Sequence, residues 1–99
     1  MKSLNEIENI IKDRKPELKA NYHVSEIGIF GSYVRNEQNE NSDIDILIEY
    51  EPGAKISLLD RSTLKNYMSD LLNAKADITR KRNIREELKE NILNGVIYL

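Results

Sequence analysis

Apolar residues recur along this chain at helical spacing in some segments and at strand spacing in others. Residues 4–20 place apolar side chains every three or four positions, which predicts a helix with one apolar face. Ser3 and Glu6 have the spacing of a capping box at its start. Pro16 lacks an N–H group, so we expect a kink or a break near Lys15.

Strict alternation follows over residues 43–50, after a short apolar run at residues 27–30 that also predicts a strand. In a strand, side chains alternate between the two faces of the sheet. One face would carry Ile44, Ile46, Ile48 and Tyr50, and the other Asp43, Asp45, Leu47 and Glu49. Between the two strands, residues 33–38 predict a short helix and residues 39–42 a loop.

The second half of the chain also shows helical spacing followed by strand-like segments. Ser57 and Asp60 form a second capping-box pattern before a helix that reaches Leu72, and residues 75–80 predict a brief strand. Asn83 would open a last helix that ends at Gly95, before a possible final strand at residues 96–99. These elements predict an α/β (α+β) fold, with a small mixed sheet of three to four strands and about four helices. We expect one domain over residues 1–99.

Composition narrows the possible chemistry. The 99 residues are 39% hydrophobic and 32% charged, as in a soluble globular protein, and they include no cysteine. Disulfides, thiolate catalysis and cysteine-based zinc sites are therefore excluded. The formal charge of −2 gives no overall attraction to nucleic acid, so direct binding of nucleic acid is not expected. No apolar run predicts a membrane span and no export signal is recognisable, so we expect a cytoplasmic protein.

Two aspartates on one side of a strand need an explanation. Asp43 and Asp45 would lie about 6.6 to 6.8 Å apart at Cα, so their charges repel unless a cation such as Mg²⁺ lies between them. Asp77, in the predicted strand 75–80, could project toward the same side as a third carboxylate. Two other interpretations are open. The pair could face solvent on an antiparallel strand, or belong to a calcium loop, although Ile44 occupies the position where an EF-hand needs glycine.

Gly31 and Ser32 come between a predicted strand and a predicted helix. Free backbone N–H groups at such a junction attract phosphate, and glycine lets the backbone approach it closely. The alternative is an ordinary turn that ends a strand, and the pattern of a P-loop is missing.

The spacing of these residues resembles a known signature. Gly31 and Ser32, ten intervening residues and then Asp43-x-Asp45 match the G-S-x(10)-D-x-D pattern of the minimal nucleotidyltransferases, in the DNA polymerase β-like superfamily. The resemblance implies that Gly31 and Ser32 hold the triphosphate of ATP and that Asp43 and Asp45 bind two Mg²⁺ ions. It also implies that Asp77 ligates the metal next to the attacking hydroxyl and acts as its general base.

One position departs from the family pattern, in which glycine commonly follows an arginine. Here Arg35 is followed by Asn36, which tolerates a left-handed backbone better than most residues. Arg35 could bind phosphate or the carboxylates, or it could be a cation at a helix end. The basic cluster formed by Arg80, Lys81, Arg82 and Arg85 could be a solvated surface or could contact triphosphate, RNA or an acidic partner.

The resemblance also implies a partner. Family members of this size are typically encoded beside a HEPN-domain toxin, and some are antitoxins that attach AMP to a tyrosine hydroxyl of that toxin. We therefore expect a Mg²⁺-dependent protein adenylyltransferase that releases pyrophosphate. The alternatives are an antitoxin that binds nucleotide without transferring it, and an aminoglycoside-type enzyme that modifies a small molecule.

Overall fold

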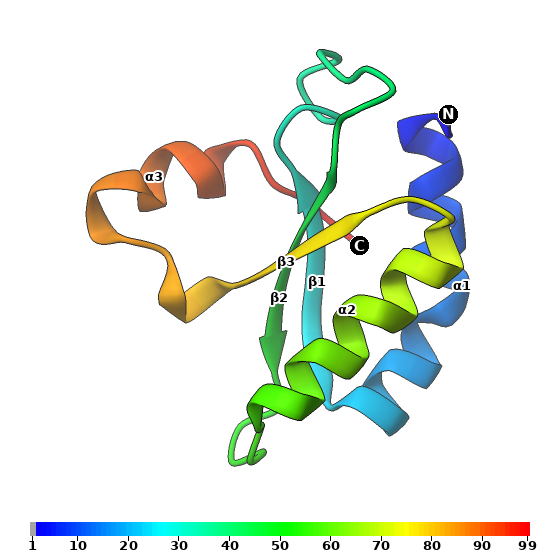
Figure 1. Ribbon diagram of the computed structural model, residues 1–99. Helices are drawn as coiled ribbons and strands as arrows, with labels where there is room; N and C mark the ends of the chain where they lie inside the picture. Colours follow the sequence, from blue (N-terminus) through cyan, green and yellow to red (C-terminus); the bar gives the residue numbers. More distant parts are fainter. Residues whose placement is uncertain (1) are drawn as a thin grey trace.

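The computed structural model of this chain describes residues 2–99. Helices and strands alternate along most of the chain (Figure 1). The elements are α1 (Leu4–Tyr22), β1 (Val24–Phe30), β2 (Ile44–Tyr50), α2 (Leu58–Leu72), β3 (Ala76–Arg80), the 3₁₀ helix η1 (Lys81–Asn83), α3 (Glu86–Asn94) and β4 (Ile97–Tyr98).

The four strands form one mixed sheet in the order β3-β2-β1-β4. The strand β2 pairs antiparallel with β1 and parallel with β3, and β4 joins the free edge of β1 in antiparallel orientation. The predicted mixed sheet is therefore confirmed, and residues 2–99 form three α-helices and one 3₁₀ helix where about four helices were expected.

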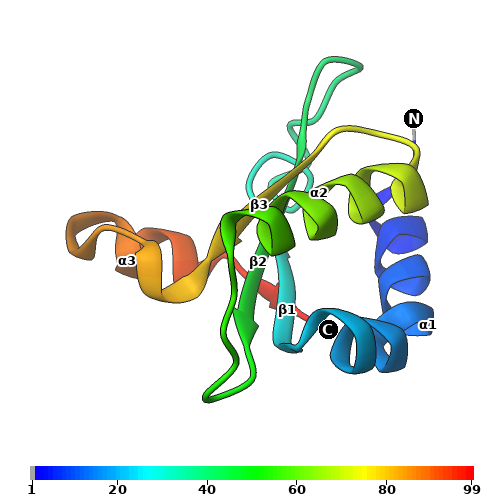
Figure 2. The same cartoon turned by 60° about the horizontal axis from the view of Figure 1, so that its bottom comes forward.

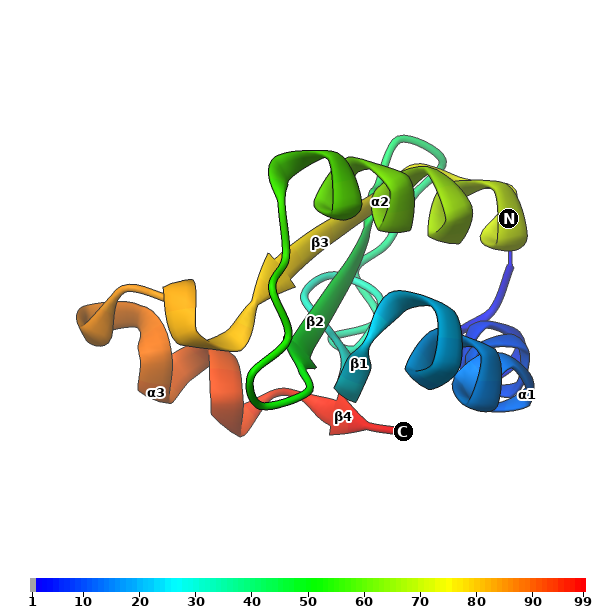
Figure 3. The ribbon, with the colours of Figure 1, turned by 90° about the horizontal axis from the view of Figure 1, so that it is seen from below.

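Helices α1 and α2 lie on one side of the sheet and α3 lies on the other (Figure 3). The core forms between the sheet and the first two helices, where the predicted apolar face of β2 is buried. Its fully buried side chains include Ile7, Ile11, Leu18, Ile29, Ile44, Ile46, Ile48, Leu64, Met68 and Leu72. Leu47 points to the opposite face and is only 1% exposed, so that face is also covered over part of its length.

Both predicted capping boxes are present. The hydroxyl of Ser3 accepts from the N–H of Glu6, and the hydroxyl of Ser57 accepts from the N–H of Asp60. In each case the acidic side chain accepts in return from the backbone N–H of the serine. These bonds satisfy N–H groups that a helix start leaves without partners, which fixes where α1 and α2 begin.

Pro16 does not break the first helix. α1 continues through it to Tyr22, so the expected break near Lys15 is wrong. The helix axis changes direction where its colour passes from dark to light blue (Figure 2), which is the kink that a ring without an N–H group favours. His23 then ends the helix in a left-handed conformation with φ 59°, and β1 starts at once at Val24, ahead of the strand predicted over residues 27–30.

Two predicted helix positions are also wrong. Residues 32–36 form consecutive turns and no helix, because Asn36 adopts φ 59° and a left-handed residue cannot continue a helix. The last helix begins at Glu86 with Arg85 as a cap that makes no side-chain bond, and Asn83 lies at the end of η1. Within residues 2–99, none of the helices combines the length and the apolar character needed to cross a bilayer.

Candidate active site

The parallel pairing of β2 and β3 brings two of the predicted carboxylates side by side. Asp45 and Asp77 are register partners, and Ile44 pairs with Ala76 next to them. Register neighbours point to the same face of a sheet, so the two carboxyl groups share the face opposite α1 and α2. Asp43 precedes β2 by one residue and lies two positions before Asp45. β2 is antiparallel to β1 and parallel to β3, and both aspartates are half-buried on this face.

Gly31 follows β1 directly and lies in close contact with the side chain of Asp45. Its φ is +80°, a conformation that L side chains rarely adopt. A methyl group placed on its Cα would collide with the Oδ2 atom of Asp45. Both the backbone angle and the close approach therefore require glycine at this position.

The turn after Gly31 leaves backbone donors open. The carbonyl of Gly31 accepts from the N–H groups of Val34 and Arg35, and the carbonyl of Ser32 accepts from Glu37. Among residues 2–99, no backbone carbonyl accepts from the N–H of Ser32 or of Tyr33. The ring of Tyr33 is only 4% exposed and anchors the turn in the core. Successive free N–H groups in such a turn can receive an anion.

The site carries more negative than positive charge. Burial, followed by the repulsion of Asp77 and then of Asp43, raises the pKa of Asp45, and Arg35 offsets part of this effect. Arg35 itself pairs with Glu37, with 3.0 Å between Nε and Oε2. Because no helix follows Gly31, the interpretation of Arg35 as a cation at a helix end is wrong.

The donors at this site suit a hard divalent cation. Carboxylate oxygens are the ligands that Mg²⁺ prefers, and a cation between Asp45 and its neighbours would relieve the repulsion that raises the pKa of Asp45. Over residues 2–99, no three acidic or histidine side chains converge closely enough to form a ready-made metal cage. Mg²⁺ usually takes one or two carboxylates together with water and phosphate oxygens.

Two hollows adjoin residues of the predicted site. One of about 690 Å³ adjoins Asp43 and is lined in part by Tyr33, Asn73 and Lys75. A smaller one of about 210 Å³ lies between the Gly31 turn and α3, with Arg35 and Ile92 in its walls. Asp43 therefore lines one space and Gly31 the other, and each space can receive part of a ligand.

Sequence reasoning missed Lys75. Its Nζ atom lies 3.7 Å from Oδ2 of Asp43, and its carbonyl accepts from the N–H of Ile44 at 2.9 Å. The position follows from the register of β2 and β3, which no local pattern around Lys75 reveals. A cation beside Asp43 is thus part of the site.

Ion pairs hold much of the basic cluster after β3 in place. Arg80 donates to Glu49 at 2.8 Å, Arg82 approaches the same carboxylate at 3.4 Å, and Lys81 pairs with Glu26 at 3.3 Å. The guanidinium of Arg80 also lies 5.1 Å from the centre of the Tyr50 ring. Arg80 is therefore a structural cation, and a purely solvated surface does not describe it.

Comparison with known proteins agrees with this geometry. The family model described as "Nucleotidyltransferase domain" matches residues 4–99. The chain belongs to the nucleotidyltransferase domain family. A protein of Methanocaldococcus jannaschii that is named as a candidate protein adenylyltransferase is 52% identical to it over 101 aligned residues, covering both chains completely. The protein adenylyltransferase MntA of Thermococcus cleftensis is 39% identical and covers all of this chain and 98% of its own length.

Solved structures share the fold. A candidate minimal nucleotidyltransferase superposes with a TM-score of 0.73 at 33% identity, over 94% of this chain and 95% of that chain. A complex from Shewanella oneidensis, of a tri-AMPylated HEPN toxin with an MNT antitoxin, aligns with a TM-score of 0.57 at 20% identity, over 95% of this chain and 66% of that chain. The predicted membership of the minimal nucleotidyltransferases is confirmed, and with it the class of enzyme.

Proposed function

We propose that this nucleotidyltransferase is a Mg²⁺-dependent protein adenylyltransferase, formed by one domain, that transfers AMP from ATP to a tyrosine hydroxyl of a partner HEPN toxin. The observation that carries this proposal is that Gly31, Asp45 and Asp77 lie next to one another at one end of the sheet. They come from the end of β1, from β2 and from β3. A phosphate-binding turn beside a carboxylate pair is the arrangement that nucleotidyl transfer requires.

The Gly31 turn would bind the triphosphate. The N–H groups of Ser32 and Tyr33, from which no backbone carbonyl of residues 2–99 accepts, can donate to phosphate oxygens, and the hydroxyl of Ser32 adds a donor. Arg35 would contact phosphate after its ion pair with Glu37 breaks. Breaking this pair costs little, because an exposed ion pair contributes little to stability.

Asp43, Asp45 and Asp77 would hold two Mg²⁺ ions. When bound, these ions would neutralise the phosphate charge and favour the ionised form of the acceptor hydroxyl. Asp45 supports this role, because burial and two neighbouring carboxylates already destabilise its own charge in their absence.

The transfer itself would be an in-line displacement at the α-phosphorus of ATP. A bond forms from the tyrosine oxygen to this phosphorus, and the bond from the phosphorus to the bridging oxygen of the leaving pyrophosphate breaks. The carboxylate of Asp77 would take the phenolic proton as general base, or pass it to solvent. The product is a tyrosine that carries AMP through a phosphodiester bond.

The names of the relatives support the acceptor and the partner. Two relatives that match nearly the whole chain are named as protein adenylyltransferases, and the Shewanella structure is of an antitoxin with its AMPylated HEPN toxin. We propose the same class of acceptor here, with the reaction in the cytoplasm where ATP and such a toxin would meet.

The test uses ATP labelled at its α-phosphate, Mg²⁺ and a HEPN-domain toxin as the acceptor protein. Label should appear on that protein with the wild type and vanish with Asp43→Asn or Asp77→Asn. Asp13→Asn, an exposed carboxylate on α1, is the matched control and should leave labelling unchanged. If Asp43→Asn and the wild type protect equally against the toxin and no label moves, complex formation without transfer replaces this proposal.

A further inference from the structure

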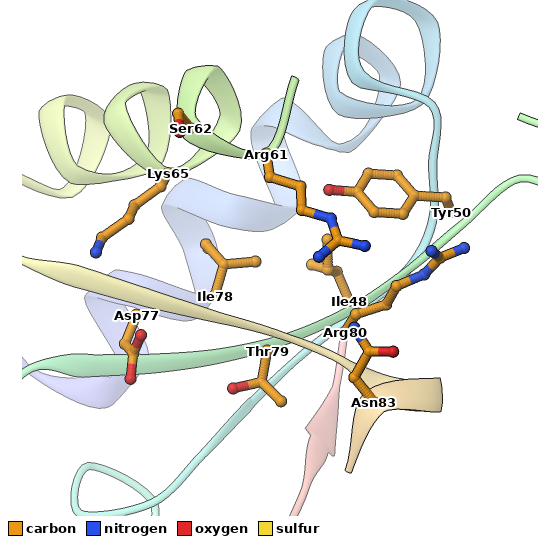
Figure 4. Close-up of a pocket in the computed structure, with 10 residues that line it drawn as sticks. All are labelled: Ile48, Tyr50, Arg61, Ser62, Lys65, Asp77, Ile78, Thr79, Arg80 and Asn83. Carbon is orange, nitrogen blue, oxygen red and sulfur yellow. The ribbon is translucent and has the colours of Figure 1, made fainter. Parts of the chain in front are cut away.

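A basic cleft lies between α2 and β3, apart from the proposed triphosphate turn. Its volume is about 350 Å³, and its walls include Arg61 and Lys65 of α2, Tyr50 of β2, and Asp77 and Arg80 of β3. Figure 4 shows the side chains of Arg61 and Lys65 extending from α2 into this space, while the carboxyl group of Asp77 points from β3 away from α2. Asp77 therefore borders the cleft at the edge of β3, with its carboxyl group on the other face of the strand, and the proposed roles give this cleft no ligand.

Two of the cations in this cleft have no partner. Arg80 is neutralised by Glu49, at 2.8 Å. Among residues 2–99, neither Arg61 nor Lys65 takes part in an ion pair, and both are exposed. Because the whole chain carries a formal charge of −2, this local positive charge opposes the overall balance. An anionic group would be attracted here.

The position of the cleft matches the direction from which an acceptor must come. Across the sheet the order is Gly31 after β1, Asp45 in β2 and Asp77 in β3, and β3 is an edge strand. In an in-line displacement the attacking and leaving oxygens lie on opposite sides of the phosphorus. If the leaving pyrophosphate is held at Gly31, the attacking hydroxyl approaches from the edge of β3, where the cleft opens.

An exposed leucine indicates what kind of acceptor the cleft fits. Leu58, Arg61, Ser62 and Lys65 follow one another at helical spacing, so they share one stripe of α2. Leu58 is 78% exposed and stands one turn before the cleft, and its neighbour Leu59 is 75% exposed. Aliphatic side chains beside unpaired cations suit a polypeptide with apolar and acidic residues better than a nucleic acid backbone.

We infer that the cleft between α2 and β3 binds the acceptor polypeptide, with Arg61 and Lys65 receiving acidic side chains next to the acceptor tyrosine and Leu58 packing against an aliphatic one. This inference rests on the proposed function, because it uses Asp77 as the group that meets the acceptor hydroxyl. Arg61 and Lys65 are specificity residues in this arrangement, and they bind neither ATP nor Mg²⁺.

The test measures binding rather than transfer. A short fluorescein-labelled peptide with one tyrosine between glutamate and leucine residues is titrated with the full chain, in the presence of Mg²⁺ and a non-hydrolysable ATP analogue. Fluorescence anisotropy should show binding that weakens about tenfold or more in the double variant Arg61→Glu, Lys65→Glu. The same peptide with lysine in place of each glutamate should bind the wild type weakly and the double variant more tightly, a reversal that a purely structural role would not produce.

Three controls separate the possible causes. Lys12→Glu changes the charge as Lys65→Glu does, on an exposed position of α1, and should leave peptide affinity unchanged. Leu58→Ser should weaken binding of the acidic peptide without changing its charge preference. Affinity for the ATP analogue should be equal in all variants.

The outcomes distinguish this inference from the proposed function. Equal affinity of the acidic and basic peptides for the wild type overturns the inference, and so does unchanged affinity in the double variant. Tighter binding of single-stranded RNA than of the acidic peptide, lost in the double variant, assigns the cleft to nucleic acid and also overturns it. If the acidic peptide binds as expected but no label is transferred to any tyrosine, the proposed function fails while the binding site stands.

Discussion

Gly31 and Asp45 are in such close contact that the side chain of Asp45 occupies the space where a Cβ atom of residue 31 would lie. The contact joins the end of β1 to the central strand β2, where Phe30 and Asp45 are register partners. It places the turn with free N–H groups next to a carboxylate in the middle of the sheet. The turn proposed to bind phosphate and the proposed metal ligand Asp45 are therefore positioned by one contact between the Gly31 backbone and the Asp45 side chain.

Gly31→Ala should abolish ATP binding. The added methyl group must displace the Asp45 carboxylate, and alanine at a φ of +80° is strained, so we expect a loss of about 1–3 kcal/mol in the free energy of unfolding. Gly53→Ala is a matched control, since Gly53 has a φ of +82° and no atom within 4 Å of an added Cβ. It should show the loss of stability alone. Calorimetric titration with ATP and Mg²⁺ checks both variants, and equal ATP affinity in the two would contradict the role of the contact.

Asp45→Asn should stabilise the protein in the absence of Mg²⁺ and nucleotide. Burial and the charges of Asp77 and Asp43 raise the pKa of Asp45, so its ionised form is unfavourable in the folded state. Removing that charge should raise the free energy of unfolding at neutral pH by about 0.5–2 kcal/mol, as other relieved functional sites do. Thermal unfolding measures the difference, and Asp13→Asn should produce none.

The same variant should respond to pH in a defined direction. A raised folded pKa means that the contribution of Asp45 to stability is fully present below its unfolded value of 3.8 and is lost as the pH rises through the higher folded value. The gain in Asp45→Asn should therefore be largest near neutral pH and disappear toward pH 3.8. With Mg²⁺ and ATP added, the wild type should become more stable than Asp45→Asn, because these ligands stabilise only the protein that binds them. A gain that grows on acidification would contradict this assignment.

Local sequence pattern predicted the features of this fold that depend on neighbours in sequence. The alternation at residues 44–50 identified the core face of β2, and the serines at positions 3 and 57 identified the starts of two helices. The short motif at Gly31 and Ser32 identified the turn, but the helix expected after it was wrong. Tertiary contacts decide that segment, because the buried ring of Tyr33 and the left-handed Asn36 fix a series of turns.

Features that depend on strand register were not predictable from such patterns. Asp77 could be proposed as a third carboxylate only from its alternation and the family resemblance, and the pairing with Asp45 supplies its actual neighbour. Lys75 next to Asp43 and Glu49 beneath Arg80 are consequences of the same pairing between segments about thirty residues apart. The register between β2 and β3 cannot be predicted from a single sequence.

Substitutions at Asn36 test whether asparagine can replace the glycine that the family commonly has at this position. Its φ of 59° is one that glycine adopts freely, that asparagine tolerates and that a β-branched residue resists. Asn36→Gly should leave ATP binding intact and change the free energy of unfolding by less than about 1 kcal/mol. Asn36→Val should lower that free energy by about 1–2 kcal/mol and weaken ATP binding, because the turn that holds Ser32 would distort. Urea unfolding and ATP titration compare the two, and a stable, ATP-binding Asn36→Val variant would show that the turn does not need this conformation.

Glu49 should stabilise the fold through Arg80, with a dependence on pH opposite to that of Asp45. Burial alone would raise the pKa of Glu49, but the hydrogen bond from Arg80, the backbone N–H of Tyr50 and the charges of Arg80 and Arg82 lower it below its ordinary value. The Glu49 and Arg80 side chains are only 18% and 17% exposed, so this pair is better shielded than a surface ion pair. Glu49→Gln should therefore lower the free energy of unfolding at pH 7 by about 1.5–3 kcal/mol.

That loss should fade in acid, which separates the charge of Glu49 from its packing. A lowered folded pKa gives stability that is present above the unfolded value of 4.5 and lost as the pH falls through the folded value. The wild type and Glu49→Gln should thus converge in stability below pH 4.5. Glu37→Gln removes the exposed partner of Arg35, where the two side chains are 63% and 60% exposed, and should cost no more than about 1 kcal/mol at any pH. Urea unfolding across this pH range tests both variants. A loss in Glu49→Gln that stays constant into acid would mean that shape, and not the bond to Arg80, is what Glu49 contributes.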